Sequence, residues 1–498
     1  MFRSLNLASL ITTTLAVLGV IALSVFVGLV AVTGWGIIYF LIVAMMGAVL
    51  LLFLSDKNLL LLGGLLVYLV VGQLMYFANI GQALWIPYGL GILLFLRLPS
   101  AFLKSPYAAT KIGVPLNLSI SFYFLIFLFS IALNETPIFQ AIVGGKNLVI
   151  FWSYFLLIAL FAIPFPATEK FVRWLLWIAV LQLPFVLYQY FVVVPERVNS
   201  LSSWDAIVGS FGGNQLAGGA SGTMAYMLLL AVLLAMRLSQ FGQMNRLLLL
   251  GITLTAGGII FLAEVKFAPL LMFVGMAVVY RKTFVRNPAV AIAGGIAALA
   301  LGLGLLVAYD KTHYADIGQE SRDIPDLLDK TFGYSLDSQF INLETGEMGR
   351  NAALIFWWEK GFLTDPLKGT LGYGPGASRS SSHFSVGQVA RKYSFGIDRS
   401  AATQLLWELG LAGFLAFVYI LLKGALLALR AANSTSSPAS AAILETAAAG
   451  LVMAVLMLPY NRDVLEVPAL TFTLMLLLGL AVQADVLRRL RREPFKQG

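Results

Sequence analysis

Apolar runs of about 20 residues recur along almost the whole chain, and each is long enough to cross about 30 Å of hydrocarbon as a helix. Of the 498 residues, 59% are hydrophobic and 11% are charged, whereas soluble proteins are about 25% charged. Backbone groups cannot remain unpaired in lipid, so spanning segments of this kind are helical. The sequence therefore predicts an all-α polytopic membrane protein.

The apolar runs predict about 14 transmembrane helices. Their approximate bounds are 8–32, 36–54, 58–77, 82–97, 114–134, 147–165, 173–194, 216–237, 247–264, 266–280, 288–309, 401–429, 441–460 and 467–486. The first run is too long for the core of a signal peptide and lacks a clear cleavage site, so we expect it to span the membrane. No internal repeat is visible, which counts against transporters built from inverted repeats.

Lys and Arg gather in alternate connections between the predicted spans, as in SDKN, RLPSAFLKSPYAATKIG and PATEKFVR, and in the tail RRLRREPFKQG. By the positive-inside rule, these connections and both termini are expected in the cytoplasm. We therefore expect a transmembrane region at 1–309 with about 11 spans, a large periplasmic loop at 310–400, and a C-terminal region at 401–498 with about three spans and a basic cytoplasmic tail.

Composition also limits the chemistry. The chain has no cysteine, which excludes disulfides, iron–sulfur clusters and thiol catalysis. The basic residues behind the net charge of +9 lie mainly in the predicted cytoplasmic connections, so no nucleic-acid partner is expected. The sequence contains no Asp-rich metal motif, and we expect neither a metal nor a cofactor.

The predicted loop at 310–400 is dense in charge but close to neutral, and it holds both histidines, His313 and His383. A connection of this length is normally functional or disordered. Its segment NAALIFWWEKGFL has the apolar spacing of an amphipathic helix, and its Trp357 and Trp358 suit a membrane interface. The loop also contains LGYGPGASRSSSHF (371–384), a polar and flexible stretch with Gly374, Arg379 and His383.

Further polar residues fall on the same predicted face of the membrane, close to the ends of spans. Each has a simple structural explanation, such as an interfacial arginine, a helix start or an ion pair at a short turn. Together, however, cations at one leaflet suit an amphiphile that carries phosphate. These residues are Arg197, Glu264, Lys266, Arg350, Asp398, Arg399, Gln404 and Glu408.

The order of these features resembles the O-antigen ligase and polymerase superfamily over roughly residues 185–425. The segment from Arg350 to Trp357 is similar to the arginine–tryptophan helix of the family's large loop. Asp365-Pro366 followed by LGYGPG is similar to its "hP-x-x-G-x-G-x-G" turn. Gln404, Glu408, Gly410 and Gly413 match "L-Q-x-x-x-E-x-G-x-x-G", and SFGGNQLAGG resembles "G-T-F-G-N-P-N-x-L-A".

Two positions depart from the family pattern. Arg399-Ser400 stands where the family usually has the histidine of "H-N-x-x-L-Q", and Val265-Lys266 stands where it often has "S-R-G". Lysine can keep the cationic role. Arginine cannot act as a base near neutral pH, because its pKa lies above about 12. The base is therefore expected to be His383 or a carboxylate, Asp398 or Glu408.

The resemblance implies transfer of a glycan from undecaprenyl pyrophosphate by displacement at the anomeric carbon. Positive charge would stabilise the leaving pyrophosphate, and we expect Arg197, Lys266 and Arg350 to supply it. The remaining expected contributors are Arg379 and Arg399 as assisting cations, Glu264 to position Lys266, Gln404 in the substrate site, and Gly374 in a turn that walls the cavity.

Three functions stay open at this stage. Loss of the usual histidine favours a polymerase of exopolysaccharide, capsule or O-antigen repeat units over a ligase that transfers to lipid A core or protein. A flippase or other transporter of lipid-linked sugars is the alternative from another class. The expected location is the bacterial inner membrane with the active site on the periplasmic face, and the expected partners are the lipid-linked donor, a glycan acceptor, the bilayer, a flippase and chain-length regulators.

Overall fold

A computed structural model describes residues 47, 51, 53–105, 107, 115–197, 203–216, 218–314, 325, 333–343, 346–380 and 386–492. The chain divides into two compact units, Met1–Leu60 and Leu61–Gly498, and the packing discussed below lies within the second. The described part is mostly helical, and its one sheet is a two-stranded antiparallel pair. The all-α prediction is confirmed at this level.

The helices and the two strands follow one another in three groups. Before residue 200 they are α3 (Asp56–Leu65), η1 (Leu66–Val70), α4 (Val71–Tyr76), η2 (Gly81–Leu84), α5 (Trp85–Phe95), α6 (Leu98–Lys104), α8 (Asn117–Leu133), α9 (Ile138–Gly145), η3 (Lys146–Ile150), α10 (Trp152–Ala159), α11 (Phe165–Tyr188), η4 (Gln189–Val193) and α12 (Val194–Glu196). Up to residue 314 they are η5 (Ser203–Ala206), α13 (Ser221–Gln240), α14 (Arg246–Leu262), α15 (Ala268–Val279), α16 (Arg281–Arg286), α17 (Pro288–Tyr309) and η6 (Asp310–Tyr314). The rest are α19 (Tyr334–Leu336), β1 (Ile341–Asn342), β2 (Glu347–Met348), α20 (Arg350–Phe356), η9 (Trp357–Phe362), α21 (Pro366–Leu371), η10 (Ala390–Lys392), α22 (Ala401–Ala432), α23 (Pro438–Met457), α24 (Asp463–Glu466) and α25 (Pro468–Arg492).

Eight helices of the described part are long and apolar enough to cross a membrane, or nine if the bent pair Gly81–Phe95 and Leu98–Lys104 is one span. The expected count of 14 is not confirmed. The predicted span 8–32 lies outside the described residues, as does nearly all of 36–54. Each later predicted span coincides with a helix, but α8, α14 and α15 have only 10–17 residues. The eight helices are Asp56–Tyr76, Ile138–Ala159, Phe165–Glu196, Ser221–Gln240, Pro288–Thr312, Ala401–Ala432, Pro438–Met457 and Pro468–Arg491.

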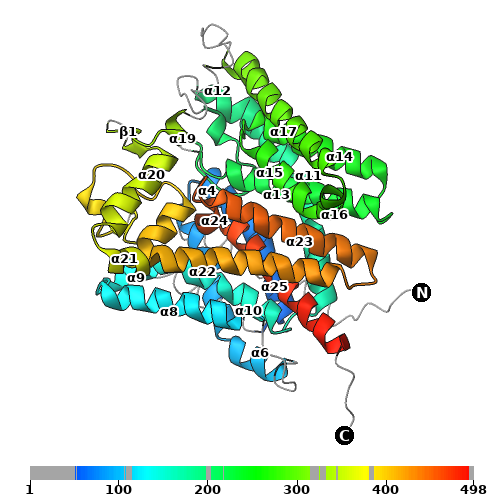
Figure 1. Cartoon of the computed structure of the whole chain (residues 1–498), viewed down its shortest axis with the longest axis horizontal. Coiled ribbons are helices and arrows are strands. Elements are labelled where there is room, and N and C mark those ends of the chain that lie inside the picture. The colour runs from blue at the N-terminus through cyan, green and yellow to red at the C-terminus, as the bar shows by residue number, and fades with distance from the viewer. Residues whose placement is uncertain are drawn as a thin grey trace. The chain divides into compact units, whose positions relative to one another are not determined.

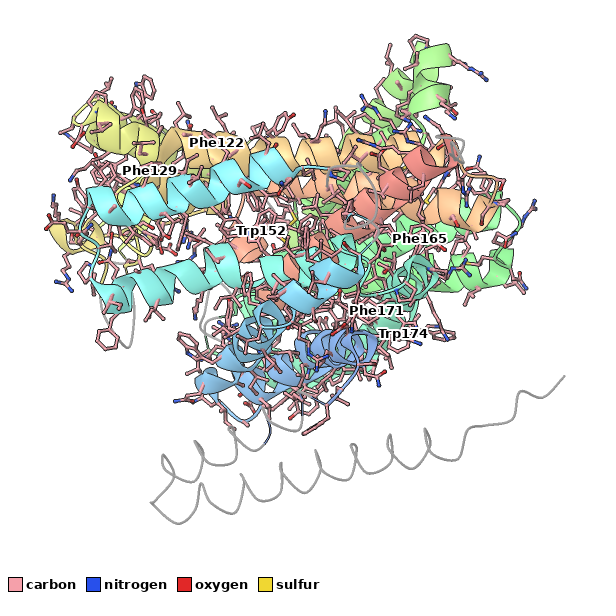
Figure 2. All side chains as sticks on the ribbon, turned by 90° about the horizontal axis from the view of Figure 1, so that it is seen from below. Phe122, Phe129, Trp152, Phe165, Phe171 and Trp174 are labelled. Carbon is pink, nitrogen blue, oxygen red and sulfur yellow. The ribbon has the colours of Figure 1, made fainter. Side chains whose placement is uncertain are left out.

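Helices α13, α23 and α25 form the interior of the second unit, since between 83% and 94% of their apolar windows is buried. Helix α22 packs on α23 and α25 and, on another side, on α8 (Figure 1). Small residues in α23 allow this close packing. On the outside, α8 exposes Phe122 and Phe129, whereas Trp152 of α10 is buried (Figure 2). Exposed aromatic side chains on a helix of this composition are suited to contact with lipid.

Helix α22 is broken at Gly410, so the predicted span 401–429 consists of two helical pieces. Gly410 has φ 69° and ψ −176°, a conformation that only glycine adopts without strain. A Cβ at this position would lie 2.3 Å from the carbonyl carbon of Thr370 at the end of α21. The break therefore lets α21 and the glycine turn that follows it approach the α22 backbone.

Residues 346–380 and 386–400 fold onto the beginning of α22, where α20 and α21 lie (Figure 1). The predicted amphipathic helix appears as α20 and η9. Trp357 of η9 is only 4% exposed and its indole N–H donates to the carbonyl of Leu406, at 2.9 Å. Trp357 therefore packs against Trp407 in an internal core, while Trp358 stays half-exposed.

The loop after α12 is held against α4 through a direct backbone contact. A Cβ at Gly72 would lie 2.1 Å from the carbonyl oxygen of Ser210 and 2.4 Å from the amide nitrogen of Gly212. The amide side chains of Gln182 and Gln189 bind the same loop at Ser210 and Gly209. These contacts fix residues 208–212.

We therefore predict that Gly72→Ala lowers the free energy of unfolding by about 1–3 kcal/mol, because the new methyl group has no room to relax against backbone atoms. Gly251→Ala is the matched control, since nothing lies within 4 Å of its Cβ position in α14. The control should be neutral or stabilising by up to about 1 kcal/mol. Thermal unfolding of the detergent-solubilised protein measures both, and equal unfolding temperatures for the two variants would contradict the packing described here.

Candidate functional site

Tyr460, in the connection between α23 and α24, joins two of the predicted site regions. Its ring stacks on Phe267 with the ring centres 4.1 Å apart and the planes 9° apart. The guanidinium of Arg350 lies 4.4 Å from the same ring centre, and its Nε donates to the carbonyl of Tyr460. Because Phe267 follows Lys266 directly, this stack brings Arg350 of the predicted loop to the α14–α15 turn.

The α14–α15 turn contains the ion pair that the sequence suggested. The ammonium of Lys266 lies 3.2 Å from a carboxylate oxygen of Glu264. Glu264 has φ 52°, a left-handed conformation that is uncommon for a residue with a side chain. The turn holds Lys266 partly exposed beside its partner, consistent with a positioning role for Glu264.

Asp205 of η5 is exposed and interacts electrostatically with several of the predicted cations. The charges that act on its carboxylate are those of Arg197, Lys266 and Arg399, together with that of Glu264. We call Arg197, Lys266, Arg350 and Arg399 the cation cluster. Three of its members share the surroundings of Asp205, and the fourth is joined to them by the Tyr460–Phe267 stack.

One member of this cluster, Arg399, lines a cavity of about 560 Å³. Asp398 lines it and is 4% exposed. Its carboxylate accepts from Arg462 at 3.1 Å and from Ser380 at 3.2 Å. Burial raises the pKa of Asp398 although Arg462 opposes the shift. The described lining consists of Gly346, Glu347, Met348, Ser380, Val386, Ala390, Arg391, Tyr393, Ser394, Phe395, Gly396, Asp398, Arg399 and Arg462.

Further ion pairs continue from the cavity toward the glycine turn. Arg399 lies 3.6 Å from Glu347 on the cavity wall. On the other side, Glu466 lies 3.7 Å from Arg462 and 3.6 Å from Arg379. Arg379 is thus separate from the cation cluster and belongs to a second group of charges around Glu466.

The LGYGPG turn packs against its own chain rather than standing free beside the cavity. A Cβ at Gly374 would lie 2.3 Å from the hydroxyl oxygen of Thr136. The Gly374 amide donates to the hydroxyl of Ser130, which in turn donates to the carbonyl of Glu408. The glycines are therefore needed for contact with α8, α9 and α22, and Gly374 is not among the residues that line the cavity.

Glu408 and Gln404 are fully buried on the first piece of α22. One carboxylate oxygen of Glu408 accepts from the hydroxyl of Ser378 at 2.9 Å. In the described part of the chain, the other oxygen and both amide atoms of Gln404 have no hydrogen-bond partner. Buried polar atoms of this kind usually bind ordered water or a ligand.

The structure separates the candidates for the base. His383 lies outside the described residues. Asp398 lines the cavity, whereas Glu408 is enclosed behind the glycine turn beside Ser378. No group of three or more His, Asp or Glu side chains within the described ranges could hold a metal ion.

Sequence reasoning missed several residues of this region: Asp205, Tyr460, Arg462, Glu466 and, as shown below, Lys146. A signal existed for those in 458–466, since PYNRDVLEVP places three charges in a short connection between apolar runs. We had assigned its first residues to a span. No comparable signal pointed to Asp205, because one carboxylate in a polar loop is ordinary.

Comparison with known proteins adds no assignment: no family model matches the chain, and a search of curated proteins found no match.

Asp463 of α24 fixes the same connection to the start of α13. One carboxylate oxygen accepts from the amide of Thr223 at 2.7 Å and from its hydroxyl at 3.0 Å. Burial raises the pKa of Asp463 to about 6, although the bonds from Thr223 oppose the shift. The folded state therefore holds the proton of this group more tightly than the unfolded state does.

This shift predicts a pH dependence of stability. The contribution of Asp463 is fully present below the unfolded value of 3.8 and is lost as the pH rises through about 6. At about 1.4 kcal/mol per pKa unit, the loss amounts to about 3 kcal/mol. Asp463→Asn keeps an oxygen acceptor for Thr223 and does not titrate. The unfolding temperature of this variant minus that of the wild type should therefore increase from pH 4 to pH 7. The exposed Glu359 provides the control Glu359→Gln, and a parallel pH profile for Asp463→Asn would show the assignment to be wrong.

Proposed function

We propose that the protein is a glycosyltransferase that joins lipid-linked oligosaccharide repeat units, using a polyprenyl-pyrophosphate-linked glycan as donor. The observation that carries this proposal is the stack of Arg350, Tyr460 and Phe267, which joins the predicted loop to the turn of Lys266. The charges of Arg197, Lys266 and Arg399 also act together on Asp205. Several cations near the ends of apolar helices, one of them on the wall of a cavity, suit an anionic headgroup whose tail lies in lipid. The resemblance to the O-antigen ligase and polymerase superfamily supports the same chemistry.

In the proposed reaction, an acceptor hydroxyl oxygen attacks the anomeric carbon of the donor. The bond from that carbon to the pyrophosphate oxygen breaks, and its electron pair leaves with the pyrophosphate. Negative charge grows on the leaving group, so fixed cations lower the barrier more than they stabilise the substrate. Arg197, Lys266 and Arg350 take this role, and Arg399 assists from the cavity wall.

The hydroxyl proton passes to a carboxylate in this proposal. Asp398 is the first candidate because it lines the cavity and its raised pKa favours proton uptake. Glu408 is the second, with one oxygen free of partners in the described part. His383 keeps the role expected from the sequence only as a hypothesis. Gln404 and Gly374 would support the Glu408 side of the site rather than touch the donor.

A polymerase of exopolysaccharide, capsule or O-antigen units remains our preferred form, and a ligase that transfers to lipid A core or protein uses the same groups. A lipid-linked sugar flippase or transporter is the second candidate, since buried charged side chains inside apolar helices, such as Lys146 and Glu408, also mark transport pathways. We place the protein in the bacterial inner membrane with both termini in the cytoplasm and the site on the periplasmic face. A flippase and a chain-length regulator are proposed partners.

Removal of a cation from the cluster tests the proposal. Arg197→Ala, Lys266→Ala and Arg350→Ala should each reduce transfer by about 10²–10³-fold, in line with the loss of one group that stabilises a transition-state charge. Lys266→Arg should retain more activity than Lys266→Ala because the charge is kept. Polymer length on the lipid-linked product measures the effect.

The control is Lys282→Ala. Lys282 is an exposed cation on α16, which follows the end of α15 that is farther along the chain from Lys266. Wild-type polymer length in all three alanine variants of the cluster would refute the shared pyrophosphate site.

A further inference from the structure

Lys146 is a buried cation that the proposed reaction does not use. It is 5% exposed and begins η3, a π-helical turn inside the apolar helix Ile138–Ala159. Its ammonium lies 4.2 Å from the ring centre of Trp85 and 4.9 Å from that of Tyr88. Short π-helical turns occur frequently at functional sites.

The charged neighbours of Lys146 come from the glycine turn and from α24. Arg379 and Glu466 both interact electrostatically with the ammonium of Lys146. Arg379 is held nearby because its Nη1 donates to the carbonyl of Val143, at 3.1 Å. A Cβ at Gly144 would lie 2.1 Å from the amide nitrogen of Gly376, so the two backbones touch. This contact and the bond to Val143 bring Arg379 close enough to act on the charge of Lys146.

Three cations of this region, Lys146, Arg379 and Arg462, share the carboxylate of Glu466. Glu466 lies 3.6 Å from Arg379 and 3.7 Å from Arg462, so two arginines already share it. Among the described residues, Lys146 forms no ion pair and no hydrogen bond, and its ammonium lies over the rings of Trp85 and Tyr88. Burial of a charge without a counter-ion is unfavourable, and rings offset only part of the cost.

We propose that Lys146 and Arg379 form a second anion site, which binds a phosphate or pyrophosphate group between the aromatic pair and the glycine turn. A pyrophosphate supplies the missing negative charge and accepts hydrogen bonds from the ammonium and the guanidinium together. Trp85 and Tyr88 form an apolar and aromatic wall suited to the part of the ligand next to the phosphate.

The anion site itself does not depend on the proposed function. Only the identity of the molecule that carries the phosphate, a lipid-linked glycan, rests on that proposal. A polymerase that takes both donor and acceptor as lipid-linked glycans handles two pyrophosphate groups. The cation cluster holds the one that leaves, and the Lys146 site holds the one that stays on the acceptor.

The test is isothermal titration calorimetry of the full-length protein in detergent with two probes, farnesyl diphosphate and inorganic pyrophosphate. Lys146→Met should weaken binding of at least one probe by about tenfold or more, the usual value of a hydrogen bond to a charged group. Lys146→Arg should keep most of the affinity. If the wild type binds farnesyl diphosphate but not inorganic pyrophosphate, the ligand is lipid-linked. If Lys146→Met loses the same affinity for both probes, the pyrophosphate group alone is sufficient for binding at this site.

Matched variants keep the result interpretable. Lys282→Met removes an exposed lysine of α16 and should change nothing. Glu466→Gln should strengthen binding, because it removes the negative charge that competes with the ligand for Arg379. This opposite change still decides the question if Lys146→Met does not yield folded protein.

Two outcomes separate this inference from the proposed function. If Lys146→Met binds both probes as the wild type does while Lys266→Met loses affinity, the second site is refuted and the cation cluster stands. If Lys146→Met loses affinity and Lys266→Met does not, the second site stands and the cluster assignment fails. Failure of the folded wild type to bind either probe overturns the second site as well.

Discussion

Placing charge inside an apolar chain is costly unless each charge meets a partner, and the connection 458–466 supplies many of those partners. It reaches four parts of the second unit at once. Two of its backbone carbonyls accept from the first amides of α22, and its carboxylate Asp463 accepts from the start of α13. Tyr460 receives Arg350, while Arg462 and Glu466 bind Asp398 and Arg379. The arrangement of the candidate site therefore depends on a nine-residue connection rather than on the long loop alone.

The two groups of cations have different surroundings. Arg197, Lys266 and Arg399 are partly exposed, and their charges act on the exposed Asp205. Lys146 is enclosed, with rings as its nearest partners. An exposed cluster suits a group that must leave after reaction, and an enclosed one suits a group that is held.

Hydrophobic periodicity was enough to predict where helices occur, because long apolar runs leave the backbone no alternative in lipid. It was not enough to predict their ends or breaks. The predicted span 147–165 begins just after Lys146, whereas the helix of the structure runs from Ile138 to Ala159 and contains this lysine. The break at Gly410 depends on contact with Thr370, which no local pattern of α22 reveals.

The candidate site was predicted unevenly for a similar reason. Arg197, Lys266, Arg350 and Arg399 stood out because charges are rare next to spans. In the structure the charges of three of them act on Asp205, and Arg350 stacks on Tyr460. Gly374 was expected to approach the substrate, but its missing side chain makes room for Thr136. Asp205 and Tyr460 were missed because their importance comes from partners distant in the sequence.

The most direct measurement is transfer by the purified protein in liposomes, supplied only with polyprenyl-pyrophosphate-linked repeat units. Our account predicts a ladder of longer lipid-linked chains, with release of one polyprenyl pyrophosphate for each bond formed. Unchanged repeat units together with their movement between the leaflets would contradict it and would identify a transporter instead.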